Sequence, residues 1–575
     1  MKSELNSEKI RRFSPEMDSL RLGMGWSEDD LEKPQVLIES TYGQSHPGSA
    51  HLDMFARAAE RGIASNGGKG ARYYVTDICD GMAQGHDGIN YSLASRDMIA
   101  NMIEIHANAT TFDAGVFIAS CDKSVPAILM GIGRVNIPSI VITGGVMDAG
   151  PNLLTLEQIG AYSAMFQRGE ISEEQFTWYK HHACPSCGAC SFMGTASTMQ
   201  IMAESLGLML PGSALMPATC GDLLEFAEKA GRCAVDMARK GVTARQIVTK
   251  ASFENAIMVH AAISGSTNSL IHIPAIAHEF GINIDAETFD RMHRGAHYLL
   301  NIRPTGRWPA QFFYYAGGVP RIMEEIKSML HLDVMTVTGK TLGENLEYLK
   351  KSRFYEKCDS YLKKWKLKRE DVIRPFDHPI GTNGTVAVLK GNLAPEGAVV
   401  KHSAVPKEMF HAILKARPFD CEEDAIAAIL HHDVKPGDAV IIRYEGPQGS
   451  GMPEMFYTTE AISSDKTLSK TIALITDGRF SGASKGPAVG HVSPEAQKGG
   501  PIALVKVNDL IELDIDKRIL QIVGINGVRK APEEIDVVLA ERRKAWKPKP
   551  EHYKSGILHF YAQHAVSPMK GGYMR

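Results

Sequence analysis

Residues 115–145 read GVFIASCDKSVPAILMGIGRVNIPSIVITGG and contain three consecutive apolar runs. The runs at 115–120 and 138–145 have the length and β-branched content of strands, and the run at 125–135 has the length of a helix. A strand, a helix and a second strand in this order build two parallel strands of one sheet. This stretch therefore predicts an α/β fold.

The same alternation precedes this stretch. KPQVLIEST at 33–41 and RYYVTDI at 72–78 are typical of strands, and the segments 51–64 and 95–109 are typical of helices. We therefore predict an N-terminal α/β domain, with a parallel sheet flanked by helices. Ligands of such sheets gather at the carboxyl ends of the strands.

The character of the chain changes after about residue 370. The charged segment 363–379 ends in prolines and is typical of a linker. Short β-rich runs separated by glycine and proline follow it, among them DAVIIRYEG and KTIALITDG. We predict two domains: residues 1–372 form the α/β domain, and residues 373–575 form a β-rich, barrel-like domain.

Composition restricts the class of protein. The chain has 575 residues, 44% hydrophobic and 22% charged, as expected for a large soluble globular protein. A net charge of −3 without a basic block argues against nucleic acid or an anionic membrane as the main partner. The N-terminus has no apolar signal region, and no run approaches the roughly 18 apolar residues of a membrane span. We expect a cytoplasmic protein.

The nine cysteines favour metal binding over disulfides, because their number is odd and no export signal precedes them. Cys184, Cys187 and Cys190 stand three apart, and Cys79 and Cys121 each precede an aspartate. A C-x2-C-x2-C run in an intracellular protein most commonly binds metal. Half of a structural zinc site is an alternative, although no second cysteine or histidine pair follows closely.

Acidic and hydroxyl side chains complete a possible catalytic set. Asp80 and Asp122 follow predicted strands, and Glu445 offers a third carboxylate from the second domain, so together they suit a magnesium-like ion. Ser481 lies in the glycine-flanked turn TDGRFSGAS, where a nearby cation would stabilise its alkoxide as a base. Each residue alone is more often a turn or capping residue. Only the combination favours an enzyme that removes water from a hydroxy acid.

The quoted motifs resemble the dihydroxy-acid dehydratase and phosphogluconate dehydratase family, which also contains the aldonate dehydratases. The resemblance runs from about residue 36 to residue 497. The matching stretches are PGSAHLD, CDGMAQGHDGINYSLASRDMI, CDKSVPAILMG, NIPSIVITGG, CPSCGACSFMGTASTM, ESLGLMLPGSA, ISGSTNSLIH, VLKGNLAPEGAVVK, RYEGPQGSGMPEM, TDGRFSGASKG and GHVSPEA.

The resemblance implies a [2Fe–2S] or [4Fe–4S] cluster beside a Mg²⁺ or Mn²⁺ ion. Asp80, Asp122 and Glu445 match ligands of the divalent ion. Lys123 matches a lysine that is carbamylated in some members and then binds the ion. Ser481 matches the base that takes the C2 proton.

The cluster ligands show one departure from the family. Cys121 and Cys190 match ligands, but members with a [2Fe–2S] cluster carry a third cysteine where this chain has Gly48. Cys79 is the candidate replacement, and Cys187 is the weaker one. The alternative for Cys79 is an ordinary buried thiol.

The resemblance implies a hydro-lyase that converts a 2,3-dihydroxy carboxylic acid into a 2-keto-3-deoxy acid, as a homodimer or homotetramer. Ala483 and the segment 303–320 resemble sugar-acid enzymes, whereas 42–53 and 85–93 lean towards the branched-chain type. We expect a sugar-acid dehydratase of broad range, with the dihydroxy-acid dehydratase of branched-chain amino-acid biosynthesis as the alternative. Two other classes are a non-catalytic iron–sulfur or zinc protein and a nucleotide-binding enzyme. The latter lacks a G-x-G-x-x-G or P-loop pattern.

Overall fold

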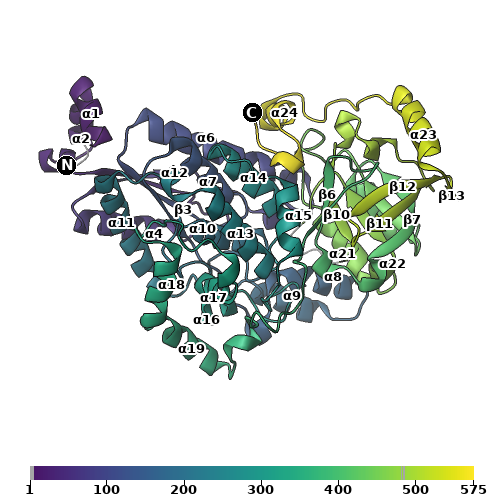
Figure 1. Ribbon diagram of the computed structural model, residues 1–575, viewed down its shortest axis with the longest axis horizontal. Helices are drawn as coiled ribbons and strands as arrows, with labels where there is room; N and C mark the ends of the chain where they lie inside the picture. The colour runs from purple at the N-terminus through teal and green to yellow at the C-terminus, as the bar shows by residue number, and fades with distance from the viewer. Residues whose placement is uncertain (1–4, 481, 483–485) are drawn as a thin grey trace.

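The computed structural model of the protein describes residues 5–480, 482 and 486–575. Two sheets organise the chain (Figure 1). The helices of the N-terminal half gather around the first sheet, and the second sheet lies at the other end of the molecule, where the C-terminal third of the chain is found. Over the part of the chain so described, no helix combines the length and apolar character that crossing a membrane requires.

The first sheet has four parallel strands in the order β2-β1-β3-β4. They are β1 (Gln35–Ser40), β2 (Lys69–Tyr74), β3 (Ala114–Ala119) and β4 (Ser139–Thr143). Every residue of β1, β3 and β4 is buried, because helices cover both faces of the sheet. This burial explains why their sequences are continuous apolar runs and do not alternate with polar residues.

Helices make up the rest of the N-terminal half. Beside the sheet lie α4 (Leu52–Ser65), α5 (Asp80–Ala83), α6 (Tyr91–Ala109) and α7 (Ser124–Val135). Three short helices precede the sheet: α1 (Asn6–Phe13), α2 (Glu16–Gly23) and α3 (Glu28–Leu31). The helices that follow it are α8 (Ile159–Gln167), α9 (Glu173–His182), α10 (Thr195–Ser205), α11 (Asp222–Lys240), α12 (Ala244–Ile247), α13 (Lys250–Ala262), α14 (Ser269–Glu279), α15 (Ala286–Arg294), α16 (Gln311–Tyr315), α17 (Gly318–Glu325), α18 (Leu342–Lys351) and α19 (Phe354–Lys364).

The second sheet has nine strands in the order β13-β12-β11-β7-β8-β9-β10-β6-β5. Its centre, from β7 to β10, is parallel, and both flanks are antiparallel. The strands are β5 (Ala387–Leu389), β6 (Gly397–Val400), β7 (His411–Phe419), β8 (Asp438–Ile442), β9 (Ala473–Thr476), β10 (Ala488–Ser493), β11 (Leu510–Asp514), β12 (Ile519–Ile525) and β13 (Val528–Arg529).

This sheet curls into a partial barrel. Lys390, directly after β5, forms a bridge with Ile519 at the start of β12, so one edge of the sheet returns towards the other flank. The predicted fold class, an α/β domain followed by a barrel-like β domain, is confirmed. The second domain contains more helix than its β-rich pattern indicated, because parallel strands need crossover connections. Its helices are α20 (Glu422–Leu430), α21 (Phe456–Ser464), α22 (Leu468–Thr471), α23 (Pro532–Ala545) and α24 (Gly556–His564).

Two details of the sequence prediction concern boundaries. The strand expected at 72–78 is β2, which begins three residues earlier, at Lys69, and ends at Tyr74. All strands of the first sheet precede residue 372 and all strands of the second follow it, and the exact domain boundary stays a prediction.

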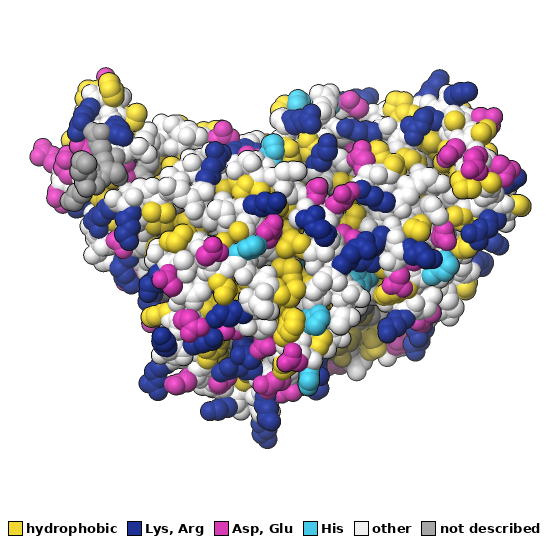
Figure 2. All heavy atoms as spheres, in the orientation of Figure 1, with side chains coloured by type: hydrophobic (Ala, Val, Ile, Leu, Met, Phe, Trp, Pro, Cys, Tyr) yellow, Lys and Arg dark blue, Asp and Glu magenta, His cyan; other side chains and the backbone are white. Residues whose placement is uncertain are grey.

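On the face shown in Figure 2, Lys and Arg are interspersed with Asp and Glu.

The crossing of α4 and α11 depends on two glycines. A side-chain carbon added at Gly62 would lie 1.9 Å from the carbonyl oxygen of Glu228, and one added at Gly231 would lie 2.1 Å from that of Ala59. The two helix backbones therefore touch directly, and a methyl group has no room between them.

We predict that Gly62→Ala lowers the apparent Tm, since overpacking a tight contact costs about 1–3 kcal/mol. Gly221→Ala is the matched control: Gly221 precedes α11, has φ −58°, and has open space around the added carbon. Thermal unfolding followed by circular dichroism measures both variants. An unchanged Tm for Gly62→Ala would contradict the close crossing.

Candidate functional site

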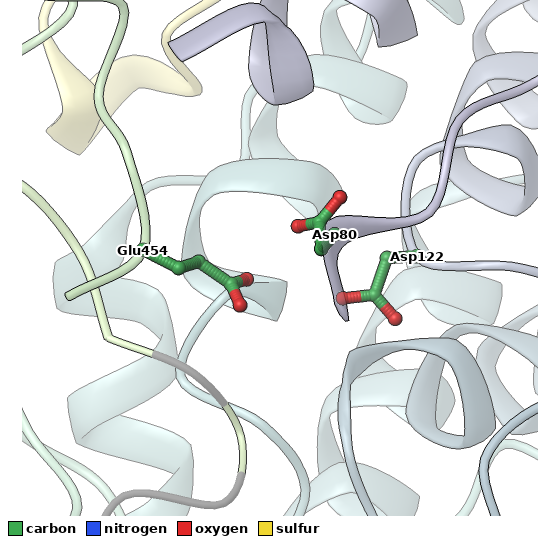
Figure 3. A group of neighbouring side chains, drawn as sticks. All are labelled: Asp80, Asp122 and Glu454. Atoms are coloured by element: carbon green, nitrogen blue, oxygen red, sulfur yellow. The ribbon is translucent and has the colours of Figure 1, made fainter. Parts of the chain in front are cut away.

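Three carboxylates meet in the interior between the two domains. Asp80, Asp122 and Glu454 each offer one oxygen, and these oxygens lie within 4.8 Å of one another (Figure 3). Asp80 and Glu454 are buried and Asp122 is partly buried. Oxygen ligands in a close group are what a hard divalent ion prefers, so this acidic triad could hold a metal.

The fold explains how distant residues reach this point. Asp122 follows β3, and Asp80 begins α5 after the end of β2. Glu454 lies between β8 and α21, at the carboxyl side of the parallel centre of the second sheet. The carboxyl ends of parallel strands from both sheets thus face one another, as expected for ligand sites in such sheets.

Two cations neutralise part of the triad. Lys123 Nζ lies 2.8 Å from Asp80 Oδ2, 3.6 Å from Asp122 Oδ2 and 3.8 Å from Glu454 Oε1. Arg479 bonds Glu454 and lies 3.5 Å from Asp80 Oδ2. Both cations are buried. Their two positive charges do not fully compensate the three carboxylates, so the group favours one further positive charge.

Neutral side chains fix the carboxylates further. The Ser92 hydroxyl donates to Asp80 at 2.7 Å and accepts from Arg479 at 2.9 Å. The Asn268 amide donates to Glu454 at 2.7 Å. Asp122 accepts from the backbone N–H of Ala196 in the first turn of α10, at 2.8 Å. These contacts hold the group in place before any ion binds.

The environment separates the acidities of the three carboxyl groups. Burial alone would raise the pKa of Asp80, but Lys123 and Arg479 outweigh it and lower the pKa to about 2. Burial raises the pKa of Asp122. Burial also raises the pKa of Glu454 to about 7, so protons and cations compete for this carboxylate near neutral pH.

Glu445, the carboxylate named from the sequence, is not a member of this triad among the residues that the structure describes. It is buried, accepts a hydrogen bond from Ser450, and its backbone N–H donates to Asp477 at 3.0 Å. Burial raises the pKa of Glu445 to about 8. Its role as a ligand stays a prediction. Glu454 lies in the same motif, RYEGPQGSGMPEM, so the motif itself was the signal for it.

Ser481 lies outside the described residues. Both of its neighbours are described: Phe480 is buried, and a side-chain carbon at Gly482 would lie 2.8 Å from Gly194 Cα. Gly194 directly precedes α10, whose first turn donates to Asp122. Arg479, which the sequence reasoning missed, lies two residues before Ser481 and contacts the triad.

Three of the predicted cluster cysteines are neighbours. A hydrogen bond from Cys121 lowers the pKa of Cys79 to about 7, and the same contact raises the pKa of Cys121. Burial, then the charges of Cys79 and Asp122, raise the pKa of Cys190 well above its usual value. Burial followed by Asp148 raises the pKa of Cys187, with no contribution from another cysteine. The charge of Cys184 also contributes to the raised pKa of Cys190, and burial followed by Cys79 raises the pKa of Cys184, so the thiols of Cys79, Cys121, Cys184 and Cys190 influence one another.

The Gly48 position lies beside this group. A side-chain carbon added at Gly48 would lie 3.6 Å from Cys121 Sγ. The Gly48 position is the one at which the resemblance expects a third cysteine in members with a [2Fe–2S] cluster. Here the His46 ring lies 2.9 Å from the added carbon and bonds Asp77 at 2.8 Å. Cys79 is not on a strand: it stands in extended conformation directly before α5, so its thiol and the Asp80 carboxylate both reach the interior.

Comparisons with known proteins give matches over nearly the whole chain. Residues 33–345 match the sequence family described as dihydroxy-acid/6-phosphogluconate dehydratase N-terminal, and residues 371–572 match its C-terminal counterpart. Dihydroxy-acid dehydratase 1 of Methanosarcina acetivorans is 42% identical over 562 residues, which cover 96% of this chain and 97% of that protein. Dihydroxy-acid dehydratase of Acetivibrio thermocellus is 42% identical over 559 residues, 95% of each chain.

We predict that Mn²⁺ binding tightens as pH rises from 6 to 8. The raised pKa of Glu454, about 7, means that most of this carboxyl is protonated at pH 6, and the ion must displace that proton. Affinity should increase by about tenfold across this range, as one proton is released per ion near the pKa. Titration followed by Mn²⁺ electron paramagnetic resonance measures it.

Glu454→Gln and Glu445→Gln form a matched pair for the same titration. Loss of a carboxylate ligand should weaken Mn²⁺ binding in Glu454→Gln and remove its pH dependence, whereas Glu445→Gln should retain both. The reverse pattern would make Glu445 the third ligand and exclude Glu454.

Proposed function

The chain belongs to the dihydroxy-acid/6-phosphogluconate dehydratase family, and from this premise we propose that it converts a 2,3-dihydroxy carboxylic acid into the 2-keto acid. As a family member it is a hydro-lyase. The observation that carries the proposal is the buried acidic triad of Asp80, Asp122 and Glu454 around Lys123.

The relatives favour a dihydroxy acid of the branched-chain type as substrate. They are named dihydroxy-acid dehydratases and match over nearly the full chain. The sugar-acid preference drawn from Ala483 and the segment 303–320 rests on short stretches, and none of these relatives is named as a sugar-acid dehydratase. It is therefore the second candidate.

We assign the divalent ion to Asp80, Asp122 and Glu454, with Lys123 as a fourth group. The Lys123 amine lies within 4 Å of all three carboxylates, so its ammonium form occupies the space where a cation would bind. Carbamylation would turn this amine into an anion and remove the repulsion between it and the ion. Carboxylate and carbamate oxygens suit Mg²⁺ or Mn²⁺.

We assign the iron–sulfur cluster to Cys79, Cys121 and Cys190. The contact between Cys79 and Cys121 and the lowered pKa of Cys79 support the view that Cys79 compensates for Gly48. Thiolates are the ligands that such clusters require. When bound, both groups would supply Lewis acidity. The hard ion would polarise the substrate carboxylate, and the cluster would polarise the leaving C3 hydroxyl.

The chain's own residues then hold the substrate and move the protons. Ser481 follows Arg479 by two residues in the sequence, and Arg479 contacts Asp80 and Glu454, which supports the serine as the proposed base for the C2 proton. The buried surroundings of the triad exclude water and strengthen each charge interaction. A homodimer or homotetramer is the expected assembly.

We predict that the purified protein forms a keto acid from dihydroxyisovalerate with a higher kcat/KM than from gluconate or xylonate. Ser481→Ala should lower kcat by about 10²–10⁴, the usual contribution of a general base, and leave the visible cluster spectrum unchanged. A keto-acid assay and an absorbance spectrum measure these effects. A preference for gluconate would restore the sugar-acid assignment, and full turnover by Ser481→Ala would exclude this serine as base.

We predict that Cys79→Ser lowers the iron and sulfide content and alters the cluster spectrum, because one thiolate ligand is lost. Cys187→Ser is the control, since no other cysteine influences Cys187. Iron analysis after anaerobic purification compares the two. Normal iron content in Cys79→Ser would show that Cys79 is an ordinary buried thiol.

A further inference from the structure

A cavity of about 640 Å³ lies between the two domains and apart from the acidic triad. Its walls come from three regions: the end of α15 and the residues after it, the loop 380–384, and the second domain at 402–410 and 515–518. None of Asp80, Asp122 and Glu454 lines it. Cavities of this volume hold small molecules.

The charges around the cavity are predominantly positive. Arg294, Lys407 and Arg518 line it, against Asp516 alone. Arg294 and Arg518 both pair with the carboxylate of Asp290, at 2.7 Å and 2.8 Å, so two guanidinium groups share one anion. Within the described part of the chain, Lys407 and Asp516 form no ion pair.

Two backbone N–H groups of the cavity-lining loop have no hydrogen-bond partner among the described residues. The loop 380–384 turns through Asn383 and Gly384, whose φ angles are 64° and 66°. No hydrogen bond among the described residues uses the backbone N–H of Thr382 or Asn383. His402, also in the wall, has its pKa lowered to about 4 by burial and is neutral at physiological pH. Free N–H groups in a tight turn are suited to an anion.

Apolar side chains also line the cavity. Tyr298, Val405, Phe410 and Ile515 line it, and Ile380 adds a side chain that is 40% exposed. An inorganic ion would leave this surface in contact with water, whereas an organic anion with a hydrocarbon portion would cover it. The combination of cations, free donors and an apolar wall defines the class of ligand.

We propose that this cavity is a second binding site, specific for a small organic anion that carries an apolar body. The anionic group contacts Lys407, Arg518 and the N–H groups of the 380–384 loop, and the hydrocarbon portion lies against Val405 and Phe410. The cavity is distinct from the proposed dehydratase site, because it shares no residue with the triad or the cysteines.

Calorimetric titration of the full-length protein with hexanoate tests the site, with hexanamide and inorganic phosphate as reference probes. Hexanoate should bind at least tenfold more tightly than either. Lys407→Glu should weaken hexanoate binding about tenfold or more by charge reversal. Asp516→Asn should tighten it several-fold by removing the one repulsive carboxylate. Both side chains are exposed and lack ion pairs in the described structure, so neither variant removes an ion pair.

Lys544→Glu, on the exposed end of α23, is the control for charge reversal and should leave hexanoate binding unchanged. Hexanoate binding that Lys407→Glu leaves intact would place the ligand elsewhere and overturn the proposal. Equal binding of hexanamide would refute the anionic requirement, and equal binding of phosphate would refute the apolar one. Absence of hexanoate binding also overturns it.

Discussion

Lys123 and Arg479 lie among three carboxylates in the protein interior, and this buried charge group joins the two domains. Two of these carboxylates, Asp80 and Asp122, come from the first domain, and Glu454 comes from the second. Buried charges are tolerated only when they are paired, and removal of one partner leaves the others uncompensated. The domains therefore complete each other's charge balance, and neither holds the whole site.

The same constraint extends through α6 to the end of the chain. Ser92 on α6 bonds Asp80, and one turn later Arg96 donates to the carbonyl oxygens of Gly571 and Gly572. The C-terminal segment thus folds back on the first domain directly behind the site. A glycine suits this position, since a side-chain carbon added at Gly571 would lie only 2.7 Å from the backbone nitrogen of Ala275.

The proposed cluster and the proposed ion share chain segments. Cys79 precedes Asp80, and Cys121 precedes Asp122, so each thiol and its neighbouring carboxylate come from one strand-end loop. A movement of either loop displaces a member of both groups. The proposed acidic and sulfur ligands thus occur as adjacent pairs in the sequence.

The sequence by itself determined the fold class, because hydrophobic periodicity and strand–helix alternation are local properties of the chain. It also determined that Asp80 and Asp122 share one edge, since parallel strands must end on the same side. The grouping of Glu454 with Asp80 and Asp122, the contacts of Arg479 and Ser92, and the cavity lined by Lys407 and Arg518 became visible only in the tertiary structure. These depend on how a loop of one domain meets the other, and contacts between distant segments leave no periodic pattern in the sequence.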